Sequence, residues 1–441
     1  MTYEEALEKI HSLLSFGSRP GLDRMRTLLK RLGDPQDKLR FIHVAGTNGK
    51  GSVCAVLSSV LVAAGYKTGL FISPYITDFR ERIQINNQMI SREALAKAVE
   101  ETYPVLMKLR GEGVVITEFE YVNALEFYIH AAENCDVVVL ETGMGGLLDC
   151  TNVIKPPLCS VITTIGLDHT AVLGSTIEEI AEQKAGIIKP GSVAVTSAQD
   201  SRALAVIAQA AKNAAVPLIE SGSVKTRVLS QDLGGSVFTA NGIELRLNLA
   251  GSHQIENAKT AIAALEYLRL NEILELTDAD IKNGVFAAQN PARLELLCRE
   301  PVVLLDGAHN PNGAGALKAA AEQFLDGKKI YCVMGMLADK DCGSAISLLA
   351  PLFEAVYTVN VSNPRTLGAE ELAAKFKPYC QNVTVCACAE NAFDLALENA
   401  RQNGGAVLVC GSLYLAGELR PYMISKTSFF TSRFLPRVLN V

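Results

Sequence analysis

A glycine-rich segment with one lysine and one nearby hydroxyl group is the part of the chain whose residue types most directly suggest chemistry. It reads Gly46-Thr47-Asn48-Gly49-Lys50-Gly51-Ser52. Glycines let the backbone approach a polyphosphate closely, and free N–H groups at a helix start attract negative charge. Lys50 can reach the terminal phosphates, and the hydroxyl of Ser52 suits Mg²⁺. The segment predicts a phosphate-binding loop that takes a polyphosphate.

This loop does not by itself decide the reaction. In the general pattern the hydroxyl residue follows the lysine directly, whereas Gly51 separates Lys50 from Ser52 here. A glycine-rich turn with an incidental lysine is the alternative interpretation. Kinases, hydrolases and ligases all use such loops, so the rest of the chain must distinguish them.

Apolar runs and helical patterns alternate around the loop and would place it at the end of a strand. The run 41–45 leads directly into the loop, and a helix is expected over 53–64. Short apolar strands that alternate with helices are typical of a parallel sheet covered on both faces. Further strands of this kind are predicted at 137–140, 160–165 and 193–196.

The pattern changes after residue 222 and again near residue 291. Turn signals in 222–250 predict antiparallel hairpins, and a helix is expected over about 254–270. A second α/β series follows, with strands predicted at 302–305, 330–335, 356–361 and 406–410. We therefore predict an α/β protein of two domains, residues 1–292 with the ATP-binding loop and residues 293–441 as a smaller Rossmann-like domain.

The composition excludes several classes of protein. The 441 residues include 41 Lys and Arg and 47 Asp and Glu, so the net charge is −6. An acidic chain of this kind has no overall positive charge with which to bind nucleic acid. The 11 cysteines form no C-x-x-C pair, which argues against a zinc ribbon or a disulfide scaffold. No apolar run reaches the length of about 18 residues that a membrane span needs, and the first residues do not resemble a signal peptide. We expect a cytoplasmic protein with reduced thiols.

Further motifs follow one another in a defined order along the chain. With the phosphate-binding loop, they resemble the folylpolyglutamate synthase/dihydrofolate synthase family, the folate branch of the Mur ligase superfamily, over nearly the whole length. The resemblance implies a P-loop domain of the Mur ligase type, with a mainly parallel sheet and a small antiparallel sheet, followed by a glutamate-ligase domain. The motifs are Gly21–Met25, Ser73-Pro74, Glu81–Ile83, Glu141–Gly146, Leu148–Asn152, Gly166–Thr170, Lys184–Ile187, His253-Gln254 with Asn257, Pro291 with Arg293, and Asp306–Pro311.

The resemblance also implies a reaction. ATP would phosphorylate a carboxylate of a dihydropteroate- or folate-type acceptor, and the amine of L-glutamate would attack the resulting acyl phosphate. An amide, ADP and phosphate would form. Phosphorylation supplies the leaving group that a free carboxylate lacks, and the developing charge must be held by metal and cations. The expected partners are these small molecules, without nucleic acid or membrane, and the expected state is a monomer.

Metal ligands and one modified lysine follow from the same resemblance. Lys184 matches a lysine that is carbamylated in the superfamily. From the residues alone, a solvated helix lysine paired with Glu178 or Glu182 is the favoured interpretation. The residues that match Mg²⁺ ligands, in two sites, are Ser52, Ser73, Glu141 and His169.

The remaining site residues fall on both sides of the proposed boundary. Gln254 and Asn257 could instead cap a helix, and Arg293 could instead pair with Glu295. The residues that match ATP contacts beyond the loop are Gln254, Asn257, Arg293 and Asp306. Catalytic roles fall to Lys50, Lys184 and His309, the last near the incoming glutamate, and Phe119 and Asp149 match acceptor contacts.

Three departures from the family pattern concern the acceptor side. Leu147 stands where arginine is usual, Tyr75 where histidine is usual, and Gln183 where glutamate is usual. A Mur-type amide ligase with a non-folate acceptor therefore stays open, as does a P-loop NTPase of another function. Only 42 residues precede His43, too few for the nucleotide-sugar domain of a peptidoglycan-type ligase.

Overall fold

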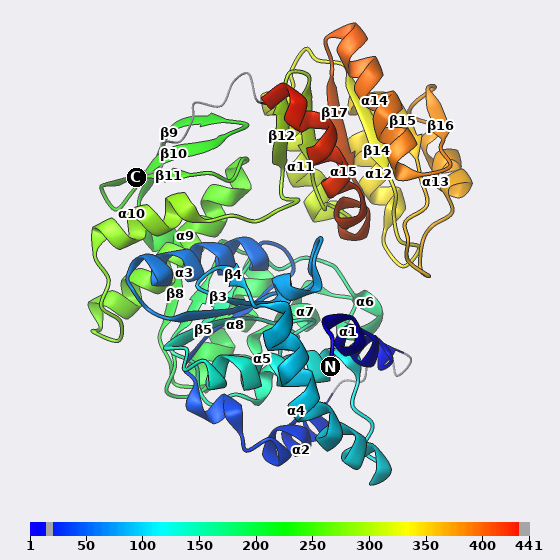
Figure 1. Cartoon of the computed structure of the whole chain (residues 1–441). Coiled ribbons are helices and arrows are strands. Elements are labelled where there is room, and N and C mark those ends of the chain that lie inside the picture. The colour runs from blue at the N-terminus through cyan, green and yellow to red at the C-terminus, as the bar shows by residue number, and fades with distance from the viewer. Residues whose placement is uncertain (15–20, 432–441) are drawn as a thin grey trace.

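The computed structural model of the chain describes residues 1–14 and 21–431, and three β-sheets lie within them (Figure 1). The largest sheet has eight strands in the order β4-β3-β2-β5-β1-β6-β7-β8. The strands from β2 to β8 in this order run parallel, whereas β3 and β4 add an antiparallel edge. The strands are β1 (Phe41–Ala45), β2 (Thr68–Phe71), β3 (Ile83–Ile85), β4 (Gln88–Met89), β5 (Val137–Glu141), β6 (Cys159–Ile162), β7 (Ala194–Thr196) and β8 (Leu218–Glu220).

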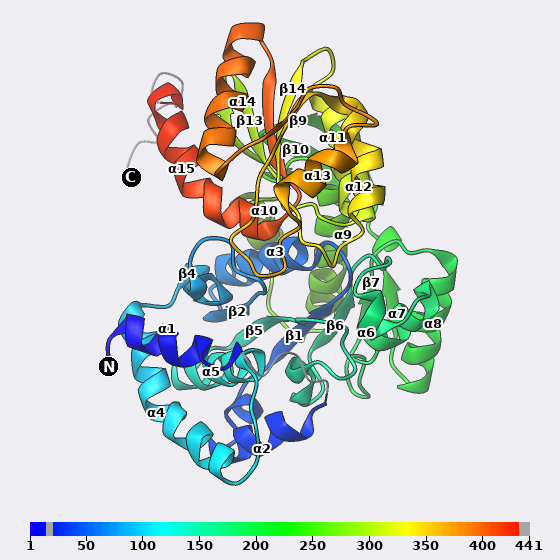
Figure 2. The same ribbon diagram turned by 90° about the vertical axis from the view of Figure 1, so that its right-hand side faces the viewer.

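Helices cover both faces of this sheet, because alternate side chains of each strand point to opposite sides. From β1, Ile42 and Val44 share an apolar core with side chains of α3, α9 and α10, whereas Phe41 shares a core with those of α1, α2, α4 and α5, and Ala45 with those of α7 and α8. Figure 2 shows α3 and α9 on one side of the sheet and α4 and α5 on the other. The helices are α1 (Tyr3–His11), α2 (Asp23–Arg31), α3 (Lys50–Ala63), α4 (Arg92–Gly111), α5 (Glu118–Ala132), α6 (Thr170–Leu173), α7 (Ile177–Ala185), α8 (Ser201–Asn213), α9 (Ser252–Leu270) and α10 (Asp278–Ala287).

A small antiparallel sheet lies beside α9 and α10 (Figure 1). It contains β9 (Thr226–Asp232), β10 (Gly235–Ala240) and β11 (Ile243–Leu247) in the order β11-β10-β9. Asn241 and Gly242 join β10 to β11 with φ values of +49° and +87°, as a tight hairpin turn requires. Phe238 and Leu247 are fully buried in the core that this sheet shares with α3 and α9. The predicted hairpins are confirmed.

The third sheet has six strands in the order β12-β13-β17-β14-β15-β16, and only β12 is antiparallel to its neighbour. Figure 2 shows this sheet and its helices above the eight-stranded sheet. Helices α11, α12 and α13 pack on one face, and α14 and α15 pack on the other. The elements are β12 (Glu295–Arg299), β13 (Val302–Leu305), α11 (Pro311–Phe324), β14 (Ile330–Met334), α12 (Cys342–Leu349), β15 (Phe353–Thr358), α13 (Ala369–Phe376), β16 (Val383–Val385), α14 (Ala389–Asn403), β17 (Ala406–Cys410) and α15 (Leu413–Thr431).

The predicted fold class is confirmed: a mainly parallel sheet, a small antiparallel sheet and a second α/β unit follow one another along the chain. The helix after the loop begins at Lys50 rather than Val53, because Gly49, in the left-handed region, precedes its first turn. Strand β6 ends at Ile162 rather than Ile165. Within the described residues, no helix combines the length and the apolar character needed to cross a membrane.

Candidate active site

The phosphate-binding loop lies at the carboxyl end of β1 and is held by the segment that follows β6. The backbone N–H groups of Thr47 and Asn48 donate to the Thr164 carbonyl at 2.9 and 3.3 Å. The Thr47 hydroxyl donates to the Gly166 carbonyl at 3.0 Å, and the Gly166 N–H donates back to that hydroxyl at 3.0 Å. Residues 163–166 therefore leave the sheet in order to brace the loop.

Gly49→Ala is expected to raise the KM for ATP at least about tenfold and to lower the Tm. Gly49 has φ +88°, where an L-residue costs roughly 1–2 kcal/mol. An added Cβ would also lie 2.3 Å from Asn257 Oδ1, so the loop or the amide must move. Gly65→Ala is the matched control, because Gly65 has φ +87° and no heavy atom within 4 Å of the Cβ position. It should lower the Tm but leave the KM for ATP unchanged; an equal KM in both variants would contradict the expectation.

One cavity of about 660 Å³ lies over the loop, between the eight-stranded sheet and the third sheet. Every residue expected to bind ATP or metal, and each expected catalytic residue, lines it. From the first part of the chain these are the whole loop with Ser73, Glu141, His169, Lys184, Gln254 and Asn257, and from the second part Arg293, Asp306 and His309. Lys50 Nζ donates to the Gly46 carbonyl at 3.1 Å and lies 3.9 Å from Glu141 Oε1.

Oxygen and nitrogen donors of the kind that Mg²⁺ accepts surround this cavity. Glu141, buried at the end of β5, accepts a hydrogen bond from the Ser73 N–H at 3.2 Å. Burial raises the pKa of Glu141, and Lys50 opposes that rise. In the described part of the chain, no group of three or more His, Cys, Asp or Glu side chains is placed so that it could hold a metal ion by itself. A carboxylate, serine hydroxyls and one imidazole fit an ion that takes phosphate and water oxygens as its other ligands.

Lys184 lies at the end of α7 and is buried, with only 4% of its surface exposed. Its ammonium group donates to the Gly46 carbonyl at 2.8 Å. Within residues 1–14 and 21–431, neither Glu178 nor Glu182 pairs with it. Burial and the neighbouring charge of Lys50 lower the pKa of Lys184 to about 7. The interpretation favoured by the residues alone, a solvated helix lysine, is therefore wrong: Lys184 is buried and bonds to the phosphate-binding loop.

Asp306 and His309 follow β13 and bring the second part of the chain to the cavity. Asp306 accepts hydrogen bonds from the N–H groups of Leu294 and Ala308, each at 2.7 Å. His309 Nδ1 lies 2.8 Å from the Gly307 carbonyl, which can only accept. Burial lowers the pKa of His309, so the ring is neutral with its proton on Nδ1 and its Nε2 free to accept.

Three polar residues that the sequence did not single out connect the two parts of the chain. Asn310 donates to Asn48 Oδ1 at 3.2 Å and to Asp168 Oδ2 at 3.1 Å. Lys340 Nζ lies 2.9 Å from Asp168 Oδ1. Asn310 and Asp168 stand inside quoted motifs, but nothing in the sequence distinguishes Lys340 from a surface lysine.

Neither alternative interpretation of the residues near the boundary holds: Arg293 does not pair with Glu295, and Gln254 and Asn257 do not cap a helix. Arg293 contacts the Ala292 carbonyl at 3.4 Å, and Glu295 pairs with Arg420 at 2.6 Å rather than with Arg293. Asn257 donates to Gln254 Oε1 at 3.0 Å, so these two amides bond to each other at the start of α9. Asn290, which the sequence did not indicate, donates to the Ser52 hydroxyl at 3.0 Å.

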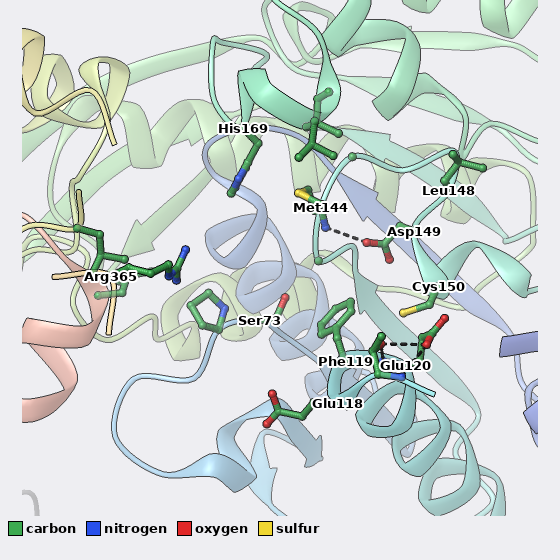
Figure 3. Close-up of a pocket in the computed structure, with 18 of the residues that line it drawn as sticks. Ser73, Glu118, Phe119, Glu120, Met144, Leu148, Asp149, Cys150, His169 and Arg365 are labelled. Atoms are coloured by element: carbon green, nitrogen blue, oxygen red, sulfur yellow. Dashed lines mark hydrogen bonds between the residues drawn. The ribbon is translucent and has the colours of Figure 1, made fainter. Parts of the chain in front are cut away.

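A second cavity of about 650 Å³ adjoins the first (Figure 3). Asp149, at its wall, accepts hydrogen bonds from the Met144 N–H at 2.8 Å and the Thr151 hydroxyl at 2.6 Å, so it also caps a turn. Phe119 covers Gly143, where an added Cβ would lie 2.2 Å from the ring. The two cavities share Ser73, Pro74, Gly143, Met144, His169, His309 and Leu413.

Two of the three departures lie close to this second cavity. Gln183 lines it, and its carbonyl accepts from the Leu147 N–H at 2.7 Å. The Leu147 side chain is 41% exposed. The aromatic ring of Tyr75 lies 5.3 Å from the Arg82 guanidinium carbon, and Arg82 lines the cavity. Gln183 therefore lies in the wall of this cavity, and Tyr75 lies beside a residue of that wall.

Comparisons with known proteins agree with this geometry. The model of the Mur ligase middle domain matches residues 44–265, and that of the Mur ligase glutamate ligase domain matches residues 292–413. The dihydrofolate synthase/folylpolyglutamate synthase of Bacillus subtilis is 38% identical over 95% of this chain and 98% of its own.

Solved structures extend the likeness to the whole fold. Folylpolyglutamate synthase of Mycobacterium tuberculosis, complexed with ADP and AMPPCP, has a TM-score of 0.88 at 30% identity and covers 96% of this chain and 99% of that chain. An FPGS–AMPPCP–folate complex has a TM-score of 0.83 at 32% identity, and the match covers 96% of this chain and 100% of that chain. The chain therefore belongs to the folylpolyglutamate synthase/dihydrofolate synthase family of ATP-dependent ligases.

Proposed function

We propose that the chain joins L-glutamate to a carboxylate of a pteroate- or folate-type acceptor and converts ATP to ADP and phosphate. The observation that supports this most directly is the pair of contiguous cavities, one over the phosphate-binding loop and one beside Phe119 and Asp149. They meet at Ser73 and His309, so an acceptor carboxylate and the terminal phosphate of ATP can come together there. The B. subtilis relative and the folate complex of FPGS support the acceptor class.

The reaction proceeds in two displacements. An oxygen of the acceptor carboxylate attacks the terminal phosphorus of ATP, the bond to ADP breaks, and an acyl phosphate forms. The amine nitrogen of glutamate then attacks the acyl carbon, phosphate leaves, and the amide remains. Lys50 and Arg293 hold the phosphate charge, and His309 Nε2, which is unprotonated in the neutral ring, accepts the proton that the attacking amine releases.

Mg²⁺ would be held by Ser52, Ser73, Glu141 and His169, in two sites. When bound, it supplies positive charge to the phosphate oxygens. The chain's own contribution is to fix these donors: Asn290 orients the Ser52 hydroxyl, and the Ser73 N–H orients the Glu141 carboxylate. Gln254 and Asn257 would contact the adenine, and Asp306 the ribose side of ATP.

The organisation of the chain completes the proposal. The domain boundary lies between residues 292 and 293, and the second domain brings Asp306 and His309 to the first through Asn310 and Lys340. We propose a monomer that acts in the cytoplasm, where its eleven free cysteines stay reduced. The exposed Leu147 in place of arginine favours, as a second candidate, the same chemistry on a related non-folate carboxylate.

Steady-state ADP release tests the proposal with ATP and Mg²⁺ present throughout. Dihydropteroate and tetrahydrofolate are each supplied with and without L-glutamate, and the ligated product is quantified. We expect ADP release that depends on both acceptor and glutamate, with one amide formed per ADP. ADP release that ignores glutamate would support the NTPase interpretation, and glutamate-dependent release only with other carboxylates would support the second candidate.

A further inference from the structure

Arg82 is a partly buried cation in the wall of the second cavity, the one proposed to take the acceptor, and it has no part in the reaction described above. Its Nε is buried and has no hydrogen-bond partner, and its guanidinium forms no ion pair with any residue that the structure describes. Burial lowers the pKa of Arg82, yet a guanidinium stays charged at neutral pH. A buried Nε–H without an acceptor is costly, so a partner from outside the chain is expected here.

Aromatic rings and one backbone contact fix the position of this cation. The guanidinium carbon of Arg82 lies 5.3 Å from the centre of the Tyr75 ring and 5.7 Å from that of Phe79. Ring faces attract a cation without neutralising it. The Ile72 N–H donates to the Arg82 carbonyl at 3.1 Å, which places Arg82 beside Ser73, where the two cavities meet.

Two acidic residues that line the same cavity as Arg82 already have other partners. The charge of Glu118 raises the pKa of Arg82, but the Glu118 carboxylate lies 3.0 Å from His11 Nδ1 and forms its hydrogen bond there. Figure 3 shows Glu118 in the cavity. Glu120 pairs with Arg24 at 2.8 Å. Among the described residues, Arg82 is therefore left without a carboxylate with which to pair.

We propose that Arg82 binds the second, non-reacting carboxylate of an acceptor that already carries a glutamate. This inference rests on the proposed function and names its preferred acceptor as a pteroylglutamate dicarboxylate rather than a pteroate monocarboxylate. A monocarboxylate must present its only carboxylate to ATP and leaves Arg82 unpaired. A dicarboxylate can present one carboxylate to ATP and the other to Arg82. The planar guanidinium can bind that second carboxylate through two parallel hydrogen bonds. The cost of the unpaired cation penalises the monocarboxylate.

Equilibrium binding to the full chain, in the presence of AMPPCP and Mg²⁺, tests the inference with two matched ligands. One is folate, and the other is folate whose non-reacting carboxylate is converted to the primary amide. We expect wild type to bind the amide about 10- to 150-fold more weakly, the range for a charge-assisted hydrogen bond. Arg82→Gln should bind both ligands equally, and Arg82→Lys should restore part of the preference.

Arg80→Gln is the control, because Arg80 lies two positions away and pairs with Asp78 at 2.8 Å outside the cavity. It should keep the wild-type preference. Equal binding of the two ligands by wild type, or a preference that survives in Arg82→Gln, would overturn the inference. The wild-type comparison needs no variant and decides the matter even if Arg82→Gln does not fold.

Turnover separates this inference from the function on which it rests. Wild type that ligates glutamate to neither acceptor removes the proposed function. If wild type ligates glutamate and Arg82→Gln lowers kcat/KM equally for dihydropteroate and tetrahydrofolate, the function stands and the role of Arg82 falls. The expected result is a rise in KM for tetrahydrofolate alone, with the KM for ATP unchanged.

Discussion

Lys50→Ala is expected to lower the kcat for glutamate-dependent ADP release by about 1,000-fold, which corresponds to about 4 kcal/mol of transition-state stabilisation. Lys50 is the cation of the phosphate-binding loop, and its ammonium group is tied to the Gly46 carbonyl at 3.1 Å. It also faces Glu141 Oε1 at 3.9 Å, between the loop and the carboxylate proposed to bind metal. Its side chain is only 17% exposed, so solvent cannot replace its charge. The loss should appear in kcat more than in the binding of the acceptor.

A surface lysine supplies the control for this variant. Lys67 pairs with Glu133 at 2.9 Å, its side chain is 39% exposed, and it lines neither cavity. Lys67→Ala should therefore keep wild-type kcat. Thermal unfolding shows whether Lys50→Ala is folded at the assay temperature. A folded Lys50→Ala that keeps more than about a tenth of wild-type kcat would contradict the role given to Lys50.

Much of the fold could be read from the sequence, because its buried parallel strands are uniform apolar runs. Strand β1 has the predicted bounds, since all five of its residues are buried. The short edge strands β4 and β16 gave no comparable signal, because their side chains are mostly exposed. The strand predicted at 160–165 was too long, because Thr164 turns its carbonyl toward the phosphate-binding loop, a contact distant in the sequence.

The candidate site could be predicted where its residues stand in motifs. All residues expected to bind ATP and metal line one cavity, although their roles stay predictions. The sequence could not indicate Lys340, whose partner Asp168 lies 172 positions away in the chain. Nor could it indicate that Arg82 has no ion-pair partner in the part of the chain that the structure describes, because this depends on which residues pair with Glu118 and Glu120. Motifs identify the chemistry, whereas pairing between distant charges emerges only from the fold.

Lys184 is expected to carry a carbamate in the working enzyme. An uncharged amine adds to CO₂ through its nitrogen, loses one proton and becomes an anion with one remaining N–H. Because the pKa of Lys184 is lowered to about 7, about half of its amine is uncharged at pH 7, against about one in 3,000 for an ordinary lysine. The uncharged fraction grows as the pH rises. The anion also removes the repulsion from Lys50, and its N–H can keep the bond to the Gly46 carbonyl.

NMR of the full chain equilibrated with ¹³C-bicarbonate measures this modification directly. We expect one carbamate resonance that grows between about pH 6 and pH 8 as the amine loses its proton. It should vanish in Lys184→Ala, whose kcat should fall by about 100-fold because the carbamate oxygens that would orient the proposed Mg²⁺ are lost.

Lys189 is the matched control, because it is partly buried and its pKa is also lowered, to about 8. Its ammonium group donates to two carbonyls, those of Asn152 and Ile154, and a carbamate with one N–H cannot satisfy both. The resonance should therefore persist in Lys189→Met. A Lys184→Arg variant with wild-type kcat would contradict the expectation, because arginine keeps the positive charge and cannot form the carbamate.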